Sequence, residues 1–137
     1  MGTYILLLRG INVGKANRLA MATLSDLLQS LGASEVKTIL NSGNAVFQWA
    51  TAVDTDSETH CSELADQIAA ALLRQTGLDL HCVVKSAAQW QQISRQLQQI
   101  TTDLLPDPSR FLIGFSRDSG TLRQFESVVV PSLQLTV

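Results

Sequence analysis

Two short segments of the sequence concentrate residue types that bind anions. Residues 9–18 hold three cationic side chains, two asparagines and two glycines, and residues 41–44 read Asn-Ser-Gly-Asn. Cations balance the charge of an anion, amides and hydroxyls donate hydrogen bonds to it, and glycines let backbone N–H groups approach it closely. The two segments predict a site for a small phosphorylated or otherwise anionic ligand, and its candidate residues are Arg9, Gly10, Asn12, Gly14, Lys15, Asn17, Arg18, Asn41, Ser42, Gly43 and Asn44.

Turn chemistry explains part of this composition without any ligand. Glycine and asparagine adopt the positive φ angles of tight turns, and a cation beside them is often simply solvated. Neither segment contains a histidine or an acid that could act as a general base. The sequence therefore supports binding better than catalysis, and no catalytic residue is assigned.

Two sharper motifs fail on inspection. The run from Gly10 to Lys15 imitates a phosphate-binding P-loop, but its spacer is one residue short and Ala16 replaces the hydroxyl that holds magnesium. The pair His81–Cys82 suggests a metal, yet adjacent residues on a strand point to opposite faces, so the two cannot readily share one. We expect neither a metal nor a cofactor.

Length, charge and composition limit the remaining classes of function. The 137 residues suit one domain, and 45% hydrophobic residues supply a core. Ten Lys and Arg against twelve Asp and Glu give a net charge of -2, which argues against a nonspecific nucleic-acid binder. Apolar runs are too short to cross a membrane, no export leader is recognised, and two cysteines make no disulfide framework. We expect a soluble cytoplasmic protein without a membrane partner.

Hydrophobic patterning predicts an α/β (α+β) chain. Short apolar runs indicate strands at residues 3–8, 36–40, 45–49 and 80–85, and helical spacing indicates one helix before Gly32 and another before Gly77. This β-α-β-β-α-β order is the split unit of the ferredoxin-like fold, which we assign to residues 1–85. In that unit the loop after the first strand, the turn between the second and third strands and the turn at 76–79 share one edge.

The remaining residues, 86–137, are predicted to extend the same domain as an incomplete α/β unit. Ser86 and Gln89 form a capping box that starts a third helix, and a loop at 101–109 follows it. Further patterns predict a strand at 110–116, a short helix at 121–125 and strand-like runs at 128–130 and 133–137.

The two candidate segments also carry a family resemblance. The run Leu7-Leu8-Arg9-Gly10-Ile11-Asn12-Val13-Gly14-Lys15, together with Asn41-Ser42-Gly43-Asn44 and Phe47, resembles the bacterial family called domain of unknown function 1697. The resemblance implies a ferredoxin-like fold with a second, partly related half, and it implies no activity. Members of that family usually continue to an Arg-Asn-Trp segment that this sequence lacks, which predicts exposed surface that a homodimer could cover.

Two alternative functions stay open at this point. Acylphosphatases are ferredoxin-like and use an Arg and an Asn, so Arg9 or Arg18 with Asn41 could serve an acylphosphatase-like phosphohydrolase by analogy of fold. A protein–protein interaction module is the other, with the uncharged glutamine face of residues 89–99 as its contact surface.

Overall fold

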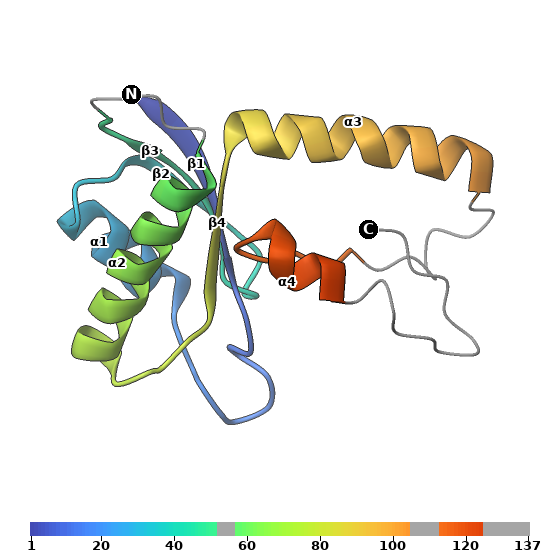
Figure 1. Ribbon diagram of the computed structural model, residues 1–137. Coiled ribbons are helices and arrows are strands. Elements are labelled where there is room, and N and C mark those ends of the chain that lie inside the picture. Colours follow the sequence, from blue (N-terminus) through green and yellow to red (C-terminus); the bar gives the residue numbers. More distant parts are fainter. Residues whose placement is uncertain (52–56, 105–112, 125–137) are drawn as a thin grey trace.

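The computed structural model describes residues 1–51, 57–104 and 113–124, and it is a mixed α+β structure (Figure 1). Four strands and four helices occur in these ranges. In chain order they are β1 (Gly2–Leu8), α1 (Met21–Ser30), β2 (Ser34–Ile39), β3 (Asn44–Trp49), α2 (Glu58–Thr76), β4 (Cys82–Ser86), α3 (Ala87–Leu104) and α4 (Ser119–Arg123).

The four strands form one antiparallel sheet in the order β2-β3-β1-β4. β1 is central, with Leu7 opposite Asn44 of β3 and Leu8 opposite Cys82 of β4. Because β1 runs antiparallel to both neighbours, its C-terminal end meets the start of β3 and the start of β4. The predicted element order is therefore present, and three chain segments meet at one edge of the sheet.

One face of the sheet carries the hydrophobic core against α1 and α2. Tyr4, Leu6 and Phe47 are fully buried on the strands, and the helices contribute Leu24, Leu27, Leu28, Ile68 and Leu72. Side chains alternate between faces along a strand, so every second residue of β1 joins this core. Figure 1 shows α1 and α2 on the same side of the sheet.

The opposite face is covered near β1 and β4. Ile5 and Val83 are only 9% and 5% exposed there. Figure 1 shows α3 and α4 on this side. α3 starts next to the sheet and then extends away from it. The rings of Trp90 and Phe115 stack with centroids 5.2 Å apart, which links the start of α3 to the segment before α4.

Helix ends follow the signals expected of them. The Ser57 hydroxyl accepts a hydrogen bond from the His60 N–H at the start of α2, and Gly77 ends that helix with φ 72°. The predicted capping box precedes α3: the Ser86 N–H donates to Gln89 Oε1, and the Gln89 N–H donates to Ser86 Oγ.

Two predictions in the C-terminal part are wrong. The loop expected from residue 101 starts later, because α3 runs to Leu104 and the first helix-breaking residue is Pro106. Residues 113–116 are not a strand, although the prediction covered 110–116. Their apolar content serves packing instead, since Phe115 stacks on Trp90. The runs at 128–130 and 133–137 lie outside the described residues.

The short helix α4 begins two residues before the predicted range. Asp118 sets its start, because Oδ1 of Asp118 accepts a hydrogen bond from the Thr121 N–H and Oδ2 accepts one from the Thr121 hydroxyl. These two bonds, the backbone bond first, lower the pKa of the Asp118 carboxyl. A capping aspartate is a stronger start signal than the apolar pattern from which the range was predicted.

We expect the Cys82 thiol to be inert in the folded protein. Burial is the main cause that raises its pKa from 9.0 to about 11, against an opposing effect of Arg117. In a Cys61→Ala variant, a thiol-specific disulfide reagent at pH 8 should label Cys82 only as fast as the protein unfolds, and at once in denaturant. Because the folded-state pKa is the higher one, the contribution of the Cys82 thiol to stability should be constant below pH 9 and should be lost as the pH rises to about 11. Rapid labelling of the native protein would contradict this.

Candidate functional site

The loop after β1 and the β2–β3 turn are held together by hydrogen bonds. The side chain of Asn12 donates from Nδ2 to the carbonyl oxygen of Asn41, at 2.7 Å. The N–H of Leu8, at the end of β1, donates to the carbonyl oxygen of Gly43, at 3.2 Å. Residues nearly thirty positions apart in sequence therefore form one continuous surface, as the strand order requires.

The side chain of Asn12 connects the loop after β1 to the β2–β3 turn. Besides its bond to Asn41, its Nδ2 donates to the Leu19 carbonyl oxygen at 2.8 Å, and its Oδ1 accepts from the Leu19 N–H at 2.9 Å. The side chain is half-buried, and the backbone has a φ of 54°. Its amide is thus committed to fixing the loop rather than open to solvent.

The other two amides of the predicted set that form bonds also serve the loops themselves. Asn17 has a φ of 49°, and its Nδ2 donates to the Gly10 carbonyl oxygen at 3.1 Å. Asn44 donates from Nδ2 to the Ser42 hydroxyl at 3.0 Å. These bonds fix the shape of the surface that the cationic side chains surround.

The three cations of the first loop are exposed. Within the described ranges, the side chains of Arg9, Lys15 and Arg18 make no hydrogen bond and no ion pair. The side chain of Asn41 is likewise exposed, and only its backbone oxygen is bonded to Asn12. These four side chains remain open to a ligand, and so does the hydroxyl of the exposed Ser42, which accepts from Asn44 and keeps its own proton to donate.

Gly43 is required where the two loops touch. It is buried, its φ is 86°, and a Cβ there would lie 2.7 Å from both Leu8 Cβ and Ile11 Cδ1. Gly10 and Gly14 also have positive φ angles, but a Cβ at either would meet nothing within 4 Å. Glycine is therefore needed for close packing at Gly43 and for backbone conformation alone at the other two.

His81 lies at the same edge and was missed by the sequence prediction. The Arg9 N–H donates to the His81 carbonyl oxygen at 3.2 Å, one residue beyond the pair of Leu8 with Cys82. Since Leu8 and Cys82 face the core, Arg9 and His81 face the other way as cross-strand neighbours. The sequence held a clue to this position, because the turn at 76–79 was expected at this edge and His81 follows it by two residues.

Two features are absent from the parts of the chain that the structure describes. No group of three or more His, Cys, Asp and Glu side chains there could hold a metal ion. No helix there is long and apolar enough to cross a membrane.

The sequence matches the family described as protein of unknown function (DUF1697) over residues 1–129. The chain belongs to this family. Among solved structures, the DUF1697 chain is similar to the conserved bacterial protein SP0830 from Streptococcus pneumoniae, with 26% identity and a TM-score of 0.66. The match covers 95% of this chain and 68% of that one. The comparison with curated proteins finds no match.

Replacing Gly43 by alanine should destabilise this DUF1697 protein strongly. The added Cβ would meet Leu8 and Ile11 at 2.7 Å, and alanine is strained at a φ of 86°. We expect a loss of about 2–4 kcal/mol in the free energy of unfolding, measured by urea denaturation. The matched control is Gly10→Ala, at φ 75° with open space around it. It should cost only about 1 kcal/mol, and equal losses for the two variants would contradict the close-packing role.

Alanine variants of Asn12 and Asn41 should differ in stability, because the side chain of Asn12 holds the loops together and that of Asn41 does not. Asn12→Ala removes one hydrogen bond to Asn41 of the β2–β3 turn and two to Leu19, and it should lower the free energy of unfolding by roughly 2–4 kcal/mol. Asn41→Ala keeps the backbone carbonyl that Asn12 uses, so stability should change by less than about 0.5 kcal/mol. Thermal or urea unfolding of both variants measures this. An Asn12→Ala variant as stable as the natural protein would show that these hydrogen bonds are not needed for stability.

Proposed function

We propose that the edge formed by residues 9–18 and 41–44 binds a small phosphorylated or otherwise anionic ligand. One observation supports this above all. Arg9, Lys15 and Arg18 extend into solvent from a loop whose own amides are engaged in fixing its backbone. A rigid loop that presents unpaired cations favours an anion, because the loop backbone loses little conformational freedom when the anion binds.

The candidate residues fall into two roles under this proposal. Arg9, Lys15 and Arg18 supply charge, and the Asn41 side chain and the Ser42 hydroxyl supply hydrogen bonds. Asn12, Asn17 and Asn44 position the loops through the bonds that they already make. Gly10 and Gly14 leave their backbone open to a ligand, since a Cβ built at either position would meet no other heavy atom within 4 Å.

The architecture around this edge is part of the same proposal. The element order and the strand order β2-β3-β1-β4 support a ferredoxin-like unit over residues 1–85. Residues 86–137 would extend that domain rather than form a separate one. The support is the ion pair of Arg117 with Asp66 on α2 and the hydrogen bond from the Ser119 N–H to Glu58 at 2.7 Å.

Titration calorimetry with inorganic phosphate at low ionic strength tests the binding function. We expect saturable binding that weakens by at least about tenfold in an Arg9→Gln, Lys15→Gln double variant and weakens as salt is added. The matched control is Arg95→Gln, because Arg95 is an exposed arginine on α3, which leaves the sheet (Figure 1). The Asn41→Ala variant should bind more weakly at unchanged stability.

Two results would count against the proposal. One is the absence of any saturable heat with phosphate at millimolar concentrations. The other is an equal loss of affinity in the double variant and in Arg95→Gln, which would indicate a general effect of net charge rather than a site.

A further inference from the structure

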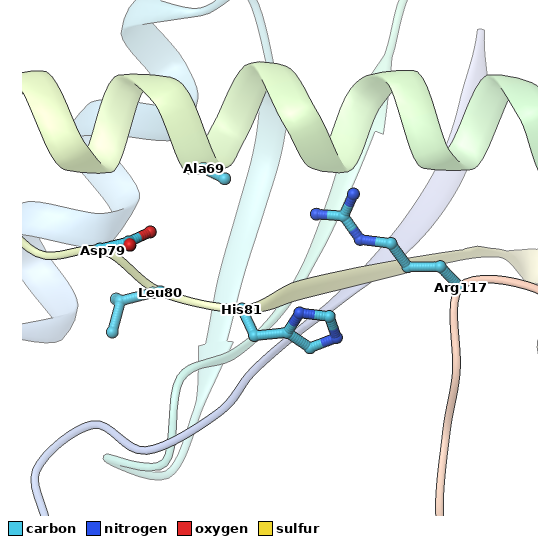
Figure 2. Close-up of a pocket in the computed structure, with 5 residues that line it drawn as sticks. All are labelled: Ala69, Asp79, Leu80, His81 and Arg117. Carbon is cyan, nitrogen blue, oxygen red and sulfur yellow. The ribbon is translucent and has the colours of Figure 1, made fainter. Parts of the chain in front are cut away.

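An open surface cavity of about 460 Å³ lies beside the segment that leads into β4, next to the edge described above (Figure 2). Ala69 of α2 and Leu80 give it apolar walls, and Asp79, His81 and Arg117 give it polar ones. Figure 2 shows Asp79 and Arg117 on opposite sides of this space, with the His81 ring below β4. The cavity thus has an acid at one end and a guanidinium at the other.

Arg117 is fixed in place by the protein. Its Nε donates to the Cys82 carbonyl oxygen at 2.7 Å, and its Nη1 pairs with Asp66 on α2. The side chain is only 24% exposed. These bonds leave Nη2 with no hydrogen-bond partner among the residues that the structure describes. A guanidinium held this way presents its remaining N–H groups in a set direction, which suits a carboxylate.

The side chains of Asp79 and His81, on the other walls of the cavity, form no hydrogen bond with the described residues. Asp79 is exposed, and its carboxylate forms no hydrogen bond or ion pair with the described part of the chain. The His81 ring is exposed as well, while its backbone oxygen accepts the bond from Arg9. An ammonium group placed near Asp79 would give this carboxylate a charge partner, which the described part of the protein does not supply.

We propose that this cavity binds a small zwitterion, a molecule of the amino-acid class with one carboxylate and one ammonium group. The carboxylate pairs with Arg117 and accepts a hydrogen bond from His81, and the ammonium pairs with Asp79. The methylene groups between them lie against Ala69 and Leu80.

The same groups disfavour ligands with a single charge. A simple anion at Arg117 would leave Asp79 without a charge partner, and a simple cation at Asp79 would leave Nη2 of Arg117 without one. A zwitterion satisfies both ends at once, so its affinity should exceed that of either half. The inference concerns a different set of residues from the phosphate edge and stands without it.

The test is an NMR titration of the whole protein with zwitterions of increasing length. The probes are glycine, β-alanine, 4-aminobutyrate and 6-aminohexanoate, with acetate and methylammonium as single-charge probes. We expect saturable shifts of the His81 ring and of residues 79–81 for a zwitterion of matching length. Its affinity should be at least about tenfold above that of acetate or methylammonium.

Substitutions of Asp79, Ala69 and Arg117 test whether the ligand binds in this cavity, and two further variants serve as controls. Asp79→Asn, at an exposed position, should weaken binding by about tenfold, whereas Asp26→Asn on α1 should not change it. Ala69→Leu fills the cavity without changing charge and should also abolish the shifts. Since Arg117 anchors its segment to α2, Arg117→Gln is informative only beside these two. Lys15→Gln with Arg18→Gln should leave zwitterion binding unchanged, which separates this site from the phosphate edge.

Several outcomes would overturn the inference. Acetate binding as tightly as every zwitterion would reduce the cavity to an anion site. Full binding in Asp79→Asn or in Ala69→Leu would place the ligand elsewhere. No saturable shift with any zwitterion at millimolar concentrations would leave the cavity without this function.

Discussion

The central position of β1 governs everything that this molecule presents at its candidate site. β1 pairs antiparallel with β3 on one side and with β4 on the other, from Tyr4 to Leu7 in both ladders. These ladders fix where the chain leaves the sheet after Leu8. They also place the Gly43 carbonyl and the His81 carbonyl within hydrogen-bond reach on the two sides of that exit. A shift of one residue in either ladder would turn the core side chains of β1 toward the opposite face and separate these segments.

Polar side chains at this edge divide their hydrogen-bonding capacity between the fold and a ligand. A buried or half-buried amide must be satisfied by the protein itself, because water reaches it poorly. Asn12 uses both of its side-chain polar atoms in this way. Arginine and lysine behave differently, since their long side chains keep the charge in water while the loop beneath them is rigid. The division explains why a loop rich in amides leaves mainly cations for recognition.

The sequence is informative about this structure where local signals and periodicity coincide. The apolar run of β1, the helix end at Gly77 and the reciprocal bonds of Ser86 with Gln89 were all predictable, because each depends on residues close together in the chain. The element order then followed, and with it the meeting of the two loops. The partners of individual amides could not be predicted, because Asn12 could equally have faced solvent. That choice is made by the carbonyl groups of Leu19 and Asn41, whose positions depend on the whole sheet.

The strand wrongly expected at residues 110–116 has a physical explanation. Apolar residues at 110–116 suggested a strand, yet a strand needs a partner with free backbone groups. Along β4 the Cys82 carbonyl is already taken by the side chain of Arg117, and the ring of Phe115 is held by Trp90. Side-chain contacts therefore attach residues 113–117 without a backbone ladder. The same contacts bring Arg117 opposite Asp79, although 38 positions separate them, so no local pattern could have revealed the cavity.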